Sequence, residues 1–209
     1  MALLPTVARK LTICSTCSRL AAVLITLTLM ATHQVFAATG QAKSEGQGRF
    51  LVATEQLDGT SFQQAVILIT HHSERGATGL AINRPTDIPL KQLFPRIPQL
   101  RQRTDPLYLG GPISTNAIFV LLRTEHPQQG MHLIADNIYF ATAQNAFRYP
   151  LDTHSRTYAG YTGWAAGQLQ DEIDRGDWLL IQTQPGIIFD DDPGGLWKRL
   201  IKGWSGQWL

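Results

Sequence analysis

The pair His71-His72, with Glu74 close behind, combines side chains that could carry metal or proton chemistry. Imidazoles can bind a metal ion or transfer protons near neutral pH. The pair follows a hydrophobic segment typical of a strand, and neighbouring residues of a strand point to opposite faces. One metal ion therefore cannot bind both rings without distortion. We expect a polar strand end in which at most one histidine forms a hydrogen bond inward.

Two further patterns resemble sites of nucleophilic or redox chemistry. Cys14 and Cys17 form a C-x-x-C sequence, a spacing used by redox dithiols and by half of many zinc sites. No second C-x-x-C accompanies it and no strand pattern precedes it, so neither role is expected.

Ser205 lies in a segment that misses the G-x-S-x-G nucleophile motif, because Gln207 occupies the last position. We expect no serine nucleophile there.

Three consecutive carboxylates, Asp190, Asp191 and Asp192, offer oxygen ligands to a hard cation. Calcium, however, takes about six to eight oxygens from a spaced loop. Asp192 directly precedes Pro193, an order typical of the N-cap and the first residue of a helix. We therefore expect a helix cap and a solvated acidic turn. Phosphate-binding loops and zinc-protease motifs are absent from the sequence, and we expect no cofactor and no bound metal.

Other polar and aromatic residues fit structural roles. Glu125, His126 and His132 flank a loop that contains proline and glycine, and we expect a solvated hairpin end. Tryptophans such as Trp164 and Trp178 are expected as core anchors first and as ligand platforms second.

The first 37 residues have the pattern of a secretory signal. A basic segment with Arg9, Lys10 and Arg19 is followed by the uncharged run 20–32. Small residues at the two positions that signal peptidase inspects occur in Val35-Phe36-Ala37. The sequence predicts a signal peptide of residues 1–37, cleavage between Ala37 and Ala38, and a periplasmic or secreted protein.

The uncharged run is shorter than the about 20 residues that a membrane-spanning helix needs, so no stable membrane anchor is expected after cleavage. Translation from Met30 would instead remove the run and leave a cytoplasmic protein, and this alternative stays open. Cleavage leaves 15 of the 18 basic residues against 16 acidic ones, a net charge of −1. Without an evident basic cluster to neutralise phosphates, no nucleic-acid partner is expected.

The 209 residues, 44% of them hydrophobic, suffice for one domain with a core. Residues 38–48 are expected as a flexible lead and 49–209 as the domain. Pro85 and Pro89 are expected to break strand pairing. Expected strands are 49–54, 65–70, 79–83, 107–109, 117–123, 131–135, 138–141, 158–161 and 178–183, and expected helices are 90–94, 165–175 with a stop at Gly176, and one beginning at Pro193. Many strands and few helices, without regular alternation, predict an α+β fold.

Six ordered sequence blocks carry a resemblance to a known family. They are Gly48-Arg49-Phe50-Leu51-Val52-Ala53, Phe62 with the strand to His72, Gly76-Ala77-Thr78-Gly79-Leu80-Ala81-Ile82-Asn83-Arg84-Pro85, Tyr108-Leu109-Gly110-Gly111-Pro112, Ile134-Ala135-Asp136-Asn137-Ile138-Tyr139, and Gly160-Tyr161-Thr162-Gly163-Trp164 with Gly167-Gln168-Leu169. On these residues the chain from about Gly48 to Trp197 resembles the YqgE/AlgH family of bacterial proteins.

The resemblance implies a single compact α+β domain of mixed, coiled β-sheets with a small barrel-like part and a few peripheral helices. It implies no established cofactor or reaction. Where relatives tend to have a histidine and a serine, this chain has Leu122 and Ala143. The family is named after a proposed role in regulating alginate synthesis, but export would separate this protein from DNA.

We expect any functional surface beside the glycine-rich segments 76–85 and 110–112, where backbones can approach closely. The candidate residues are His72, Asn83, Arg84, Gly110, Gly111, Asp136 and Trp164. Arg84 can form two parallel hydrogen bonds to a carboxylate, and the equally open alternative is a structural arginine bonded to local carbonyls.

Two classes of function fit these residues. The favoured one is a non-enzymatic binding or regulatory domain whose partner is a protein or a small anionic ligand. The alternative is a hydrolase with a site around His72, Asn83 and Asp136, since catalytic groups can converge from distant positions. A pocket that joins His72, Asn83 and Arg84 would favour the enzyme.

Overall fold

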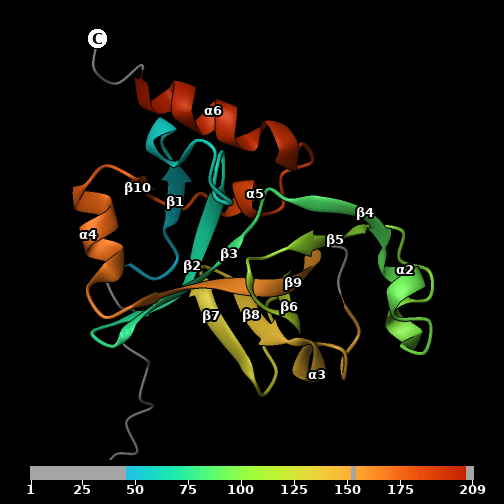
Figure 1. Ribbon diagram of the computed structural model, residues 1–209. Coiled ribbons are helices and arrows are strands. Elements are labelled where there is room, and N and C mark those ends of the chain that lie inside the picture. Colours follow the sequence, from blue (N-terminus) through green and yellow to red (C-terminus); the bar gives the residue numbers. More distant parts are fainter. Residues whose placement is uncertain (1–45, 152–153, 206–209) are drawn as a thin grey trace, which may run out of the picture. The chain divides into compact units, whose positions relative to one another are not determined.

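A curled β-sheet forms the body of the protein (Figure 1). The computed structural model describes residues 46–151 and 154–205. The expected signal peptide, its cleavage site at Ala37 and Ala38, and nearly all of the expected lead lie outside the described residues. The strands are β1 (Phe50–Ala53), β2 (Val66–Ser73), β3 (Gly76–Ala81), β4 (Pro85–Pro89), β5 (Pro106–Leu109), β6 (Ile113–Arg123), β7 (Met131–Ala135), β8 (Ile138–Thr142), β9 (Ser155–Ala165) and β10 (Trp178–Ile181).

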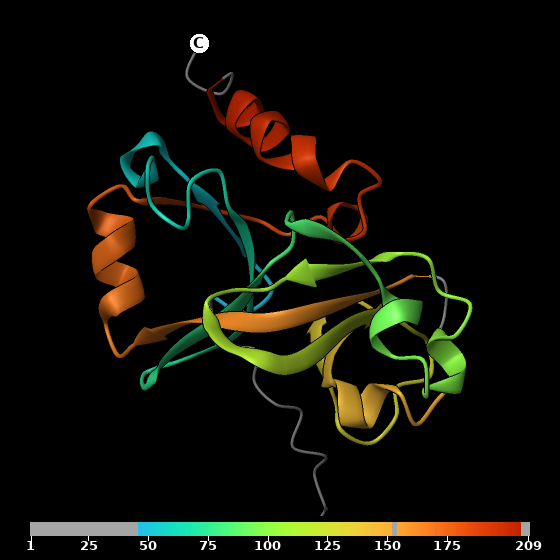
Figure 2. The same ribbon diagram turned by 45° about the vertical axis from the view of Figure 1, so that its right-hand side comes forward.

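The helices are short and lie around the sheet (Figures 1 and 2). They are α2 (Leu90–Leu93), α3 (Ala143–Ala146), α4 (Gln168–Asp174), α5 (Pro185–Ile188) and α6 (Pro193–Ser205), with 3-10 turns η1 (Glu55–Leu57) and η2 (Pro98–Leu100). Among the described residues, no helix has the length and hydrophobicity that crossing a membrane requires.

The strand order is β10-β1-β2-β3-β9-β6-β8-β7, and β4 and β5 form a branch beside β9. The pairing of β5 with β9 is parallel, and the other pairings in the sheet are antiparallel. The expected α+β fold with a mixed, coiled sheet is therefore confirmed. β9 is central, because β6 pairs along one edge while β3 and β5 share the other.

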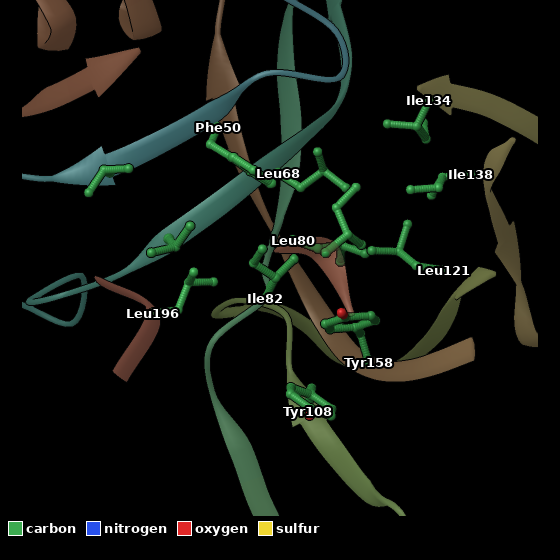
Figure 3. Close-up of a cluster of buried hydrophobic side chains, with 13 residues drawn as sticks. Phe50, Leu68, Leu80, Ile82, Tyr108, Leu121, Ile134, Ile138, Tyr158 and Leu196 are labelled. Carbon is green, nitrogen blue, oxygen red and sulfur yellow. The ribbon is translucent and has the colours of Figure 1, made fainter. Parts of the chain in front are cut away.

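The continuous hydrophobic run in β2 is buried on both faces, as expected. Val66 and Leu68 join a cluster inside the curl of the sheet, where Leu80 and Tyr158 also lie (Figure 3). The alternate residues Ile67 and Ile69 pack in a second cluster on the other face, together with Trp164, Leu169 and Trp178. The period of two along a strand thus divides one short segment between two cores.

The expectation that Pro85 and Pro89 break pairing is wrong. Both lie in β4, with Pro85 opposite Tyr108 and Pro89 opposite Pro106 of β5. Proline is tolerated there because β4 lies on the outside of the branch, where a missing backbone N–H disturbs no further strand. The strand β9 is also longer than expected, and the short helices α3 and α5 were not expected.

A close backbone crossing joins β5, the turn after it and β9. Gly110 donates its N–H to Ala159 O at 2.8 Å, and its own carbonyl accepts from Ala81 N at 2.8 Å. A Cβ on Gly110 would lie 2.4 Å from Gly160 O, and a Cβ on Gly160 would lie 2.4 Å from Gly111 O. Gly160 also has φ +70°, a region that favours glycine. The crossing requires glycine both in the turn after β5 and in β9.

Candidate functional site

A cavity of about 640 Å³ lies where the end of β6, the β7–β8 turn and the start of α5 meet. β6 pairs with β8 up to its last residue, with Arg123 opposite Ile138. The N–H of Thr124 then donates to Asn137 O at 2.9 Å, which extends the pairing beyond the strand. This register brings two short polar segments side by side. The lining residues are Arg123, Thr124, Glu125, Asp136, Asn137, Tyr139 and Pro185.

Arg123 supplies the positive charge of the cavity. Its Nη2 donates to Pro185 O at 3.1 Å, and its guanidinium carbon lies 5.6 Å from the centroid of the Phe189 ring. These contacts hold the guanidinium against the segment that contains α5. The buried Nε has no hydrogen-bond partner among the described residues. Because this atom is buried, Arg123 acts on the cavity through its positive charge rather than through Nε.

Two carboxylates share the cavity with Arg123. Asn137 donates from Nδ2 to Glu125 Oε1 at 2.7 Å, which orients one of the carboxylates. Asp136 occupies the tight turn with φ +42°, a conformation that aspartate tolerates better than most residues. The lining thus combines one guanidinium with two carboxylates, and this charge set matches a small molecule that itself carries both charges.

A second cavity, of about 580 Å³, lies beside Tyr108, Arg156 and Phe189. Its arginines are engaged by the protein. Arg103 forms a two-pronged ion pair with Asp105, at 2.6 and 2.9 Å. Arg156 donates to the carbonyls of Ile188 and Asp190 and stacks over the Tyr108 ring. The first cavity, whose Arg123 takes part in none of the described ion pairs, is the candidate ligand site.

The expected candidates His72 and Asn83 do not meet. Asn83 accepts from Val66 N through Oδ1 and donates to Gln64 O through Nδ2, each at 2.9 Å, so it lies at the beginning of β2. His72 lies six residues further along β2, roughly 20 Å away at the usual rise of a strand. It packs against the backbone of Gly46. The pocket that would have favoured the enzyme is not formed by these residues.

Arg84 is engaged by local carbonyls. It donates from Nη1 to Ser61 O at 2.6 Å and from Nη2 to Gln63 O at 3.2 Å. Burial lowers the pKa of Arg84 from its ordinary value. This geometry is that of the structural alternative, and a role of Arg84 in partner binding stays a prediction.

The other candidates divide between the core and the cavity. Gly110 and Gly111 belong to the backbone crossing near Gly160. Trp164 is 6% exposed, and its ring lies 6.2 Å from that of Trp178, so both are core anchors as expected. Of the candidate residues, Asp136 alone lines the first cavity.

The acidic turn before α6 has the expected capping role. Gly195 N donates to Asp192 Oδ1 at 3.0 Å, and this bond, with the Arg199 guanidinium, lowers the pKa of the Asp192 carboxyl. Arg199 also pairs with Asp190 at 2.7 Å.

Within the parts of the chain that the structure describes, no three Cys, His, Asp or Glu side chains form a group able to hold a metal ion.

Sequence reasoning missed Arg123, Tyr139 and Pro185. One sequence feature could have pointed to Arg123 and Tyr139. Each has a polar end group and lies within or at the end of a segment expected as a strand. Pro185 joins them only through the fold, 62 residues after Arg123.

Comparison with known proteins gives one consistent result. A model of the AlgH-like family matches residues 50–208. A UPF0301 protein of Magnetococcus marinus is 31% identical over 169 residues, which cover 74% of this chain and 87% of that protein. A UPF0301 protein of Burkholderia multivorans is 36% identical over 156 residues, covering 68% of this chain and 79% of that protein.

Solved structures agree with these relatives. The solution structure of the AlgH protein from Pseudomonas aeruginosa is similar with a TM-score of 0.61 and 29% identity, covering 79% of this chain and 91% of that one. A crystal structure of a Corynebacterium diphtheriae protein has a TM-score of 0.63 at 23% identity and covers 76% of this chain and 86% of that one. The second likeness shows the shared fold alone.

Proposed function

The protein belongs to the AlgH-like family, and from this premise we propose that it is an exported, non-enzymatic binding domain for a small molecule that carries both a carboxylate and an amine. The observation that supports this function is the charge set of the first cavity. Arg123 places its positive charge there, beside the carboxylates of Glu125 and Asp136.

The geometry suits a dipolar ligand better than a simple anion. A carboxylate bound beside the Arg123 guanidinium would form a charge-assisted interaction, which is stronger than a bond between neutral groups. A simple anion would also meet the two carboxylates and be repelled by them. An ammonium group on the same ligand turns this repulsion into attraction. The volume fits a molecule the size of an amino acid or a dipeptide.

A non-enzymatic role is supported by the way the candidate polar residues are used. Asn83 and Arg84 are bonded to the backbone around β2, and His72 lies at the other end of that strand. Neither His72 nor Asn83 lines the cavity that contains Asp136. A hydrolase built from His72, Asn83 and Asp136 therefore has no geometric support.

Substituting Arg123 with glutamine should weaken ligand binding about tenfold or more. The expected result in isothermal titration calorimetry is that free amino acids and dipeptides bind the unaltered protein, and that N-acetylated and amidated derivatives bind about tenfold more weakly. Arg123→Gln should weaken binding of the zwitterionic probes to the same degree or more. Arg175→Gln is the control, because Arg175 pairs with Asp177 on the surface. Equal binding by Arg123→Gln, or no binding of any zwitterion, would overturn the proposed function.

Export rests on the order of the basic segment, the uncharged run and Val35-Phe36-Ala37. We expect the cellular protein to begin at Ala38, and intact-mass spectrometry of protein purified from its own cells measures this directly. A chain that begins at Met1 or Met30 in the soluble cytoplasmic fraction would contradict export. Such a result would leave the ligand site untouched.

A further inference from the structure

We propose that a groove between the α2–η2 segment and α3 docks an acidic peptide segment of a partner protein. This inference does not depend on the ligand cavity, because the groove is formed by other elements. Figures 1 and 2 show α2 and α3 at the same corner of the protein. The groove has a volume of about 420 Å³, and its lining residues are Phe94, Arg96, Ile97, Pro98, Gln99, Ala143, Gln144, Phe147 and Arg148.

The floor of the groove is apolar and its two walls are tied together. The rings of Phe94 and Phe147, one from each wall, lie 5.7 Å apart. Gln99 donates from Nε2 to Phe147 O at 2.9 Å. Its buried Oε1 has no partner within the described part of the chain. The groove therefore has a fixed apolar floor on which a side chain of an occupant can pack.

The rim of the groove is positively charged. Arg96 stands on the α2–η2 wall and Arg148 on the α3 wall, and both are exposed. Residues 88–104 contain four basic residues and no acidic one, and residues 137–151 contain one basic residue and no acidic one. The ion pairs described for this protein include neither Arg96 nor Arg148. Folding therefore places one exposed arginine on each wall of the groove.

This combination selects the kind of occupant. A chain with an apolar side chain flanked by carboxylates can fill the floor and reach an arginine on each wall. A flat headgroup surface would not reach the apolar floor formed by Phe94 and Phe147. A phosphate backbone would gain nothing from those rings. Charge complementarity with an apolar anchor therefore indicates an acidic peptide segment.

The test is fluorescence anisotropy with a labelled peptide that has phenylalanine at its centre and two glutamates on each side. The unaltered protein should bind it, and the double variant Arg96→Glu with Arg148→Glu should bind about tenfold more weakly. The control variant Arg75→Glu with Lys198→Glu makes the same charge change at exposed residues elsewhere, and it should retain binding. The same peptide with lysines in place of glutamates should bind the groove variant better than it binds the unaltered protein.

The control variant carries the same charge change and should show no such gain, so the comparison separates a reversed groove from a general effect of charge or misfolding. Equal binding of the acidic peptide by both double variants would overturn the proposal. So would tighter arginine-dependent binding to anionic phospholipid vesicles or to duplex DNA than to the peptide. Because Arg123 is unaltered in both variants, binding of zwitterions to the cavity remains a separate readout.

Discussion

Gly160→Ala should cost more than about 4 kcal/mol of folding free energy, enough to leave little soluble protein. The new Cβ would lie 2.4 Å from Gly111 O and 2.9 Å from Ile113 O, both backbone atoms. Neither carbonyl oxygen can move away from the new Cβ without disturbing the pairing of β9 with β5 or β6. The positive φ of Gly160 adds roughly 1–2 kcal/mol of strain.

A second glycine, Gly167, separates the cost of the steric contact from the cost of the positive φ. Gly167 has φ +77°, close to that of Gly160, and a Cβ there would meet nothing within 4 Å. Gly167→Ala should therefore cost only about 1 kcal/mol. The yield of soluble protein measures the Gly160→Ala variant, and urea unfolding followed by tryptophan fluorescence compares Gly167→Ala with the unaltered protein. Equal losses at the two positions would show that the crossing is looser than the structure indicates.

Glu172→Ala should cost about 4 kcal/mol, because it removes the acceptor shared by two indoles. The Nε1–H groups of Trp164 and Trp178 donate to Glu172 Oε2 at 2.7 and 2.8 Å. Both tryptophans are buried, so each N–H would lose its partner away from water. Glu172→Gln keeps an acceptor oxygen and should cost about 1–2 kcal/mol.

Asp174 on the same helix provides the control. Its carboxylate accepts from Gln170 Nε2 at the surface, so Asp174→Ala should change stability by less than about 0.5 kcal/mol. Thermal unfolding with tryptophan fluorescence reports both the stability and the environment of the indoles. A loss at Glu172 no larger than that at Asp174 would contradict the shared-acceptor argument.

Local pattern was sufficient to locate most strands. Met131–Ala135 was predicted with its observed bounds, because hydrophobic residues there are enclosed by turn-forming ones. The strand β9 was underestimated, since Gly160 and Gly163 lower its strand propensity while long-range pairing on both edges stabilises it. Likewise, β4 escaped detection because its prolines are acceptable only at the outside of a sheet, a position that sequence does not reveal.

The candidate site was less predictable than the fold. Sequence identified Asp136 and Glu125 as polar residues near turns, but their meeting with Arg123 depends on the register of β6 and β8. Asn83 and Arg84 looked available for a partner because hydrogen bonds to distant backbone carbonyls leave no local signal. The groove rim was missed for a similar reason, since its two arginines come from segments 52 residues apart.

The central position of β9 determines when the sheet can form during synthesis. Its pairing partners β3, β5 and β6 all precede it in the chain, and Gly76 of β3 pairs with Ala165, 89 residues later. Synthesis begins at the N-terminus, so the β1–β2–β3 meander can form early. The sheet stays incomplete until β9 has been synthesised. Such long-range pairing slows folding, because distant segments must meet before the contacts stabilise them. This delay keeps the chain unfolded for longer, and the proposed export would use that interval, because a chain that crosses a membrane before folding must not fold early.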